Sequence, residues 1–208
     1  MDPEPQPLEQ TKGAQTRRAI LEAAISRFGR DGYRSTSVAD IARDAGVGGT
    51  VAYAYFPGKE ALFLAAVDED AAAVISQGLA HLDDPDIDDW RSSLIFTLVG
   101  AVDGHPLARR LLAGLEPDVT ARVLEIPALA ELRKACTERL RDEQVTGTVR
   151  PDIDPSSIAN GVVSIILSLL MSVVQLGTDT ATTYADDVAA VFEAALDPTP
   201  PLRPTRRR

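Results

Sequence analysis

The basic and hydroxyl-bearing side chains of residues 12–59 suit binding to phosphate groups rather than catalysis. This segment holds eight Lys or Arg and four Asp or Glu, whereas positions 60–202 hold nine basic and 24 acidic residues. The net charge of −10 therefore conceals a basic segment attached to an acidic body. Such an asymmetry is expected where a nucleic-acid reader is joined to a unit with another task.

Motifs for catalysis are missing from the sequence. It has neither a Gly-x-Ser-x-Gly elbow nor a phosphate loop ending in Gly-Lys-Ser/Thr, and its two histidines lie 24 positions apart. The acidic stretch 83–89 lacks the Gly and Glu that an EF-hand loop needs, so we interpret it as a helix-capping loop. Cys136 is the single cysteine and cannot form an internal disulfide, which favours a reducing, cytoplasmic location. We expect no enzyme activity, no metal site and no cofactor.

Short predicted helices position the basic side chains. An apolar stripe predicts a first helix that ends at Gly32, namely Ile20, Leu21, Ala24 and Phe28. The same periodicity over 38–45 predicts a second helix, with Ser37 or the rival Thr36 as its N-cap. A third short helix, about 49–56, ends before Pro57-Gly58. Two short helices joined by a tight turn form a helix-turn-helix, whose second helix fits the major groove of B-DNA.

Residues 17–62 resemble the TetR family of one-component regulators. The resemblance rests on three runs that keep the family's spacing without a gap: Arg17…Ile20-Leu21…Ala24…Phe28…Gly32-Tyr33, then Thr36-Ser37-Val38…Ile41-Ala42…Ala45-Gly46-Val47, then Tyr53-Ala54-Tyr55-Phe56-Pro57-Gly58-Lys59-Glu60-Ala61-Leu62. A lone helix-turn-helix is a weak signal, but the trailing Tyr-x-Tyr-Phe-Pro-x-Lys-Glu-x-Leu makes it strong. The rest of the chain carries no motif, and only its length and helical pattern agree with the family's ligand domain.

The resemblance implies a set of DNA-contacting residues: Arg17, Thr36, Ser37, Arg43, Gly48, Gly49, Thr50, Tyr53, Tyr55 and Lys59. Thr36 or Ser37 at a helix N-terminus would offer hydroxyl and backbone N–H groups to a phosphate. Tyrosines 53 and 55 and the lysine match positions that touch the DNA backbone, while Arg43 and residues 48–50 would face base edges. The chain departs from the family at Gly48-Gly49, where Ser followed by Lys, Arg or Pro is common. This departure removes side chains that could read bases but lets the backbone approach DNA closely.

The remainder of the chain is predicted to be helical. Further helices are expected at about 59–81, after Asp88 or Asp89 with Trp90, Leu94 and Leu98 facing inward, after His105-Pro106, at about 127–144, at 155–176 and at about 180–196. The fold class is therefore all-α, with about nine helices. The expected order is a disordered arm over 1–13, a helix-turn-helix DNA-binding domain over 14–60, a helical ligand-binding and dimerisation domain over 61–197 and a disordered Pro/Arg tail over 198–208.

Two further sets of residues are candidates for binding in the helical body. The ligand candidates, each of which could instead be a core or surface residue, are Trp90, Phe96, His105, Arg109 and Met171. The resemblance implies that the last two helices form a four-helix bundle with a second copy, through Val162, Ile166, Leu169, Val173, Tyr184, Val188 and Phe192. The apolar run 161–176 is interrupted by serines and is shorter than the roughly 20 residues that a bilayer span needs, so we expect no membrane contact.

The sequence thus predicts a sequence-specific, DNA-binding transcriptional regulator. The expected partners are double-stranded DNA, an unidentified small-molecule ligand and a second copy of the chain. The expected action is repression at a near-palindromic operator, relieved by the ligand. Two alternatives stay open: a transcriptional activator, and a helical ligand- or partner-binding protein whose DNA reading Gly48-Gly49 has weakened. The sequence identifies neither the ligand nor the operator nor the regulated genes.

Overall fold

The computed structural model describes residues 12–82, 87, 89–118, 125–177 and 179–198. Over these ranges it contains nine α-helices and no β-strand, which confirms the predicted all-α class. The predicted arm over 1–13 and tail over 198–208 lie almost wholly outside the described residues, as does most of the acidic loop 83–89.

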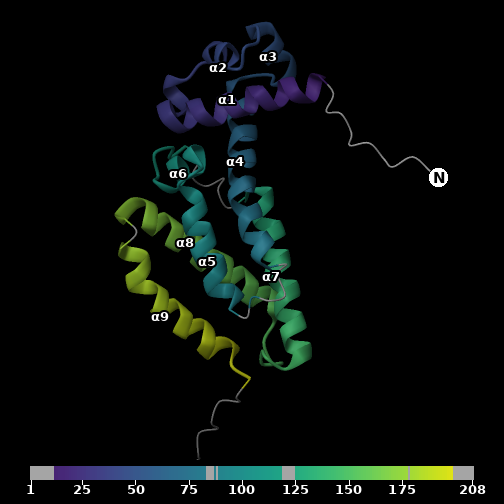
Figure 1. The fold of residues 1–208 in the computed structure, drawn as a ribbon, viewed down its shortest axis with the longest axis vertical. Helices are drawn as coiled ribbons and strands as arrows, with labels where there is room; N and C mark the ends of the chain where they lie inside the picture. The colour runs from purple at the N-terminus through teal and green to yellow at the C-terminus, as the bar shows by residue number, and fades with distance from the viewer. Residues whose placement is uncertain (1–11, 83–86, 88, 119–124, 178, 199–208) are drawn as a thin grey trace, which may run out of the picture.

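Three helices form a group at one end of the molecule (Figure 1): α1 (Lys12–Ser35), α2 (Val38–Asp44) and α3 (Gly49–Tyr55). The apolar stripe predicted on the first helix is buried. Gly32 interrupts α1 with φ 81° and ψ 168°, a conformation that side-chain-bearing residues rarely adopt, which explains why the main run of the helix ends there. The Phe28 ring meets the Phe63 ring of the next helix edge-on, with centroids 4.9 Å apart, so the group packs onto the body.

Ser37 is the N-cap of α2, which decides between the two predicted caps. Its Oγ accepts a hydrogen bond from the backbone N–H of Asp40 at 3.2 Å. Thr36, the rival, is buried and donates its hydroxyl to the carbonyl oxygen of Gly32 at 2.8 Å. The expectation that the Thr36 hydroxyl is offered to a phosphate is therefore corrected, because that hydroxyl is engaged with the backbone of α1.

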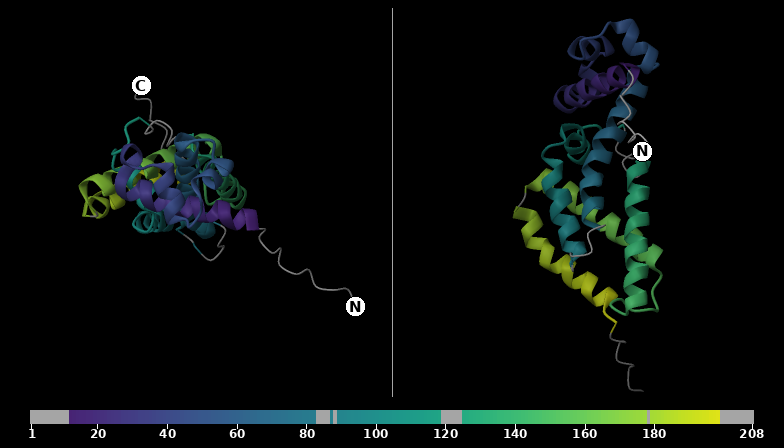
Figure 2. Two further views of the ribbon diagram at one scale, coloured as in Figure 1. Left: turned by 90° about the horizontal axis from the view of Figure 1, so that it is seen from above. Right: turned by 45° about the vertical axis from the view of Figure 1, so that its right-hand side comes forward.

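Six helices form the body: α4 (Lys59–Leu82), α5 (Trp90–Val102), α6 (Pro106–Leu112), α7 (Pro127–Thr146), α8 (Pro155–Leu176) and α9 (Asp179–Leu196). Helix α4 runs from the three-helix group into the body, while α6 lies at the junction and α9 along the outside (Figures 1 and 2). Asp89 caps α5 by accepting the Ser92 N–H at 3.2 Å. Trp90, Leu94 and Leu98 are buried, as predicted.

Helix α8 has the bounds that the sequence predicts, but the membrane argument from its length was wrong. The helix is 22 residues long with a mean hydropathy of 2.1 in its most apolar stretch, so by length and composition it could cross a membrane. In the fold it packs against α5, α6, α7 and α9 and buries one side inside the body. The core helix of a helical protein meets the same criteria of length and composition.

Candidate functional site

The outer surface of α2 and α3 carries most of the predicted DNA contacts. Ser37 and Arg43 on α2 and Thr50 on α3 are exposed. Tyr53 and Tyr55 are 55% and 36% exposed, although the body of a tyrosine ring favours burial. Exposed hydroxyls and a guanidinium on these two helices can reach the phosphates and base edges of a duplex.

Gly48 and Gly49 begin α3 without any packing need for glycine. A Cβ added at either position would meet no atom within 4 Å. The carbonyl oxygen of Gly48 accepts from the N–H groups of Val51 and Ala52, yet no side chain caps the helix. The front of the predicted reading helix is therefore bare backbone, so any direct contact there is made by N–H groups or by Thr50.

Arg43 shares its guanidinium with a carboxylate of its own helix. Arg43 Nη1 donates to Asp40 Oδ1 at 3.0 Å, and the Ser37 hydroxyl donates to Asp40 Oδ2 at 2.6 Å. The Ser37 hydroxyl, together with the guanidiniums of Arg27 and Arg43, holds the pKa of Asp40 below its ordinary value. Because a guanidinium has five N–H donors, Arg43 can keep this bond while its other N–H groups reach a base edge.

An ion pair that the sequence analysis did not identify clamps α1 to α2. Arg27 donates Nε–H and Nη2–H to the two carboxylate oxygens of Asp44, at 2.6 Å and 3.0 Å. Such a two-pronged pair fixes orientation as well as distance. These residues stand 17 positions apart on different helices, so no spacing rule along one helix could have paired them.

Two predicted contacts at the edge of the group are partly engaged within the chain. Lys59 is half-buried, and its Nζ lies 4.5 Å from the centroid of the Tyr33 ring and 3.3 Å from the carbonyl oxygen of Arg34. The guanidinium of Arg17 lies 5.3 Å from the centroid of the Phe56 ring. Both cations therefore help to hold the helix-turn-helix together and remain close to its surface.

Known proteins with similar sequences agree with this geometry. Residues 20–66 match the family of bacterial regulatory proteins, tetR family. Over 175 residues the chain is 29% identical to the HTH-type transcriptional repressor Rv1474c of Mycobacterium tuberculosis, which covers 80% of this chain and 86% of that protein. Residues 20–66 therefore form a domain of the tetR family of bacterial regulatory proteins.

The likeness to known proteins extends over the body as well. The HTH-type transcriptional regulator UidR of Escherichia coli is 26% identical over 70% of this chain and 74% of its own length. A solved gamma-butyrolactone receptor, described as ArpA-like, has a TM-score of 0.53 and 27% identity, covering 90% of this chain and 91% of its own. A regulator from Cytophaga hutchinsonii shows the same fold, with a TM-score of 0.71 at 19% identity over 92% of this chain and all of that chain.

Within the body, α6 is tied to α4 by Asp70, which the sequence analysis did not single out. Asp70 is only 4% exposed, and its Oδ2 accepts the backbone N–H groups of Leu107 and Ala108 at 3.0 Å and 2.8 Å. Its Oδ1 lies 2.8 Å from His105 Nδ1. A carboxylate at a helix N-terminus is stabilised by the helix dipole. An aspartate on the apolar side of α4, between Val67 and Val74, was a usable signal.

The other side of α6 is in close contact with α1. A Cβ at Gly29 would come within 2.7 Å of the Pro106 Cβ, so only glycine permits this approach. Glu116 accepts the backbone N–H of Tyr33 at 3.0 Å and Arg110 Nε at 2.7 Å. A shift of α6 relative to α4 must therefore be felt by α1.

A narrow cavity of about 60 Å³ lies inside the body beside α6. Its lining is wholly apolar and comes from α4, α5, α6, α7, α8 and Ile126. Ala71 of α4 and Ala108 of α6, neighbours of the Asp70 contact, are part of this lining. Widening of the cavity would thus press on α6, the helix that contacts α1 of the three-helix group.

The five predicted ligand residues do not surround one cavity. Trp90 is buried and donates Nε1–H to Glu143 at 2.8 Å, whereas Phe96 is 58% exposed on α5. His105 is held by Asp70, Arg109 pairs with Asp103 at the surface, and Met171 is half-buried. A helical pattern says which positions share a face but not which neighbour that face meets.

The predicted dimer residues divide into two groups. Five are buried within the same chain: Val162, Ile166, Val173 and Phe192 are corrected to core residues, whereas Leu169 also lines a groove between α8 and α9. Tyr184 and Val188 of α9 instead line a surface groove of about 330 Å³, opposite Ser164, Ser168 and Ser172 of α8. The outward side of the α8–α9 pair therefore carries small serine side chains and is partly apolar.

Proposed function

We propose that this chain is a homodimeric transcriptional repressor that a small molecule releases from a near-palindromic operator. The observation that carries the proposal is the exposed α2–α3 surface, with Arg43, Thr50, Tyr53 and Tyr55 at the end of a helical body of TetR type. Support comes from relatives: Rv1474c is named a repressor, and the gamma-butyrolactone receptor is named for a small molecule.

DNA contact would place α3 in the major groove, with Tyr53, Tyr55 and Ser37 on the flanking phosphates. A dimer would carry two such helices to successive grooves on one side of the duplex, about 34–36 Å apart or a multiple of that distance. Because residues 12–59 are net basic and the body is net acidic, the DNA phosphates would be attracted to the three-helix group and not to the body.

The second copy would pack on the outward side of α8 and α9. The small serines of α8 permit close approach of helices, and Tyr184 is 52% exposed at this groove. Ser168→Arg would place a bulky charge there. We expect this variant to shift the sedimentation coefficient from that of a dimer toward that of a monomer. Operator affinity should also fall, because a monomer contacts one half-site whereas a dimer contacts two.

The ligand would act through α6. An apolar molecule that enlarges the internal cavity would push α6 against α1 near Gly29 and change the spacing of the two reading helices. The ligand can shift the equilibrium off DNA by no more than its preference for that second conformer.

Selection from random duplex DNA at two salt concentrations tests the proposal. Recovery of a near-palindromic sequence whose affinity falls with salt is the expected result. Tyr53→Phe should weaken binding to all sequences, whereas Glu138→Gln, on α7 and away from the reader, should not. If no sequence is enriched and the weak binding is unchanged by Tyr53→Phe, Gly48-Gly49 has removed DNA reading and the chain is a helical ligand- or partner-binding protein.

A further inference from the structure

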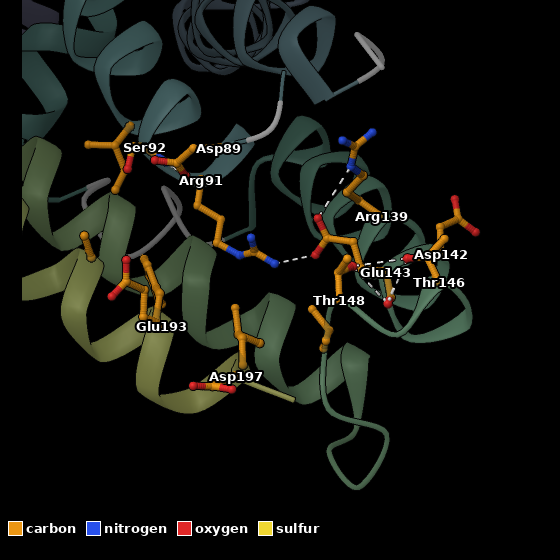
Figure 3. Close-up of a pocket in the computed structure, with 15 residues that line it drawn as sticks. Asp89, Arg91, Ser92, Arg139, Asp142, Glu143, Thr146, Thr148, Glu193 and Asp197 are labelled. Carbon is orange, nitrogen blue, oxygen red and sulfur yellow. Dashed lines mark hydrogen bonds and ion pairs between the residues drawn. The ribbon is translucent and has the colours of Figure 1, made fainter. Parts of the chain in front are cut away.

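A second and larger hollow lies beside the start of α5 and the ends of α7 and α9 (Figure 3). These helix ends are at the end of the body remote from the three-helix group (Figure 1). The hollow is bounded by the first turns of α5 and the last turns of α7 and α9, and its volume is about 770 Å³. Small-molecule sites commonly have volumes of about 300–1,000 Å³. The hollow shares no lining residue with the narrow apolar cavity beside α6.

One part of the lining is apolar and buried. Ile95 of α5, Val149 after α7, and Phe192 and Leu196 of α9 are all buried and line the hollow. The carbonyl oxygen of Leu196 accepts the N–H of Arg150 at 3.0 Å, which ties the end of α9 to the segment after α7. This part of the lining can cover a hydrocarbon group of a ligand.

The two arginines of the lining, Arg91 and Arg139, both form ion pairs with Glu143. Arg91 Nη2 bonds to Glu143 Oε2, and Arg139 Nε lies 3.8 Å from Glu143 Oε1 (Figure 3). Arg139 also donates Nη2–H to the carbonyl oxygen of Ile87 at 3.3 Å. Each arginine thus donates to a protein acceptor through Nη2 and forms part of the wall, although the Nε of each is buried without a hydrogen-bond partner among the described residues.

The remaining charges at the hollow are negative. Five carboxylates and two guanidiniums line it, a net charge of −3. Asp142 on α7 and Glu193 on α9 project from different walls (Figure 3), and neither pairs with a cation or hydrogen-bond donor among the described residues. The Asp89 carboxylate accepts the backbone N–H of Ser92. A hollow with an apolar wall and two carboxylates, Asp142 and Glu193, that pair with no cation among the described residues is complementary to a ligand of opposite charge.

We propose that this hollow binds an organic cation with an apolar body, at a site separate from the cavity beside α6. An ammonium or guanidinium group would be attracted by Asp142 and Glu193, and the hydrocarbon part would lie against Phe192 and Ile95. An anion of the same size would meet net negative charge, and an uncharged molecule would gain only the apolar contact. Binding at this site requires no DNA, so its test is independent of the test of the regulator function.

Calorimetric titration of the full chain with octanediamine tests the inference, with octanediol and octanedioate as probes of equal length. We expect saturable binding of the diamine, weaker binding of the diol and none of the dioate. Raising the salt concentration from about 0.02 M to about 0.5 M should weaken binding of the diamine but not binding of the diol. Asp142→Asn and Glu193→Gln should each raise the dissociation constant about three-fold, since exposed ion pairs contribute modestly. Glu138→Gln, the same charge change on α7 outside the lining, should leave it unchanged.

Several outcomes would overturn the inference. Equal binding of the diamine and the dioate would show that charge plays no part. An equal loss in Glu138→Gln would show only general attraction to an acidic protein. A diamine affinity that is unchanged in the double variant Asp142→Asn/Glu193→Gln would put the cation elsewhere.

Discussion

Asp70 Oδ1 lies 2.8 Å from His105 Nδ1, so a buried carboxylate of α4 holds the residue that precedes α6. The same side chain accepts two backbone N–H groups of α6. The position of α6, and through Gly29 that of α1, therefore depends on one side chain of α4.

Asp70→Ala should destabilise the protein by about 3 kcal/mol, because it leaves two buried N–H donors and a histidine without their acceptor. Urea unfolding measures the change. Amide hydrogen exchange at Leu107 and Ala108 should accelerate more than exchange in α7. Glu69→Ala, the exposed neighbour on α4, is the matched control, and a similar loss there would contradict the assigned role.

The Arg27–Asp44 clamp should make part of the stability depend on pH. The Arg27 hydrogen bond holds the pKa of Asp44 below its ordinary value of 3.8, so the stabilisation is complete above that value and is lost as pH falls through the lower, folded-state pKa. Thermal unfolding between about pH 7 and pH 2 should show Arg27→Gln less stable than the parent at neutral pH, with the two curves converging in acid. Parallel curves would mean that the pair does not couple to folding.

Gly49→Ala should stabilise the folded chain by up to about 1 kcal/mol, since alanine is the better helix former and its Cβ meets no atom. If the bare backbone approaches DNA closely, operator affinity should fall in the same variant. Thermal unfolding and DNA titration separate the two effects. Gly46→Ala serves as the contrast: Gly46 has φ 69°, so alanine there should destabilise. An unchanged operator affinity in Gly49→Ala would place the DNA away from this backbone.

Lys59→Gln should lower the salt dependence of DNA binding by about one unit of the log–log slope, as expected for the loss of one phosphate contact. The variant also loses the contact with the Tyr33 ring, so its thermal midpoint must be measured alongside. Lys134→Gln, an exposed lysine of α7, is the control. An unchanged slope in Lys59→Gln would confine this lysine to its contact with α1.

Cys136 should react with iodoacetamide only when the chain unfolds. The thiol is buried in α7, and burial raises its pKa to about 12, so the reactive thiolate is scarce at neutral pH. The alkylation rate should follow the unfolding rate across a urea series. Rapid alkylation of the folded protein would show that α7 opens locally.

Much of the fold follows from local features of the sequence. The bounds of α8, the end of the main run of α1 at Gly32 and the Asp89 cap of α5 were predicted because periodicity, caps and glycine act within a few residues. The helix-turn-helix was predicted for the same reason, since its motif is continuous along the chain.

What only the tertiary structure decided is which side of each helix meets which neighbour. Helix α8 is apolar almost all round, so its pattern could not show that Val162 and Ile166 face the chain's own core and Ser168 the surface. Asp70 and His105 stand 35 positions apart, and Arg27 and Asp44 lie on different helices. Such pairs form only when packing of the apolar faces has set the helix directions, because contacts across helices have no fixed spacing in the sequence.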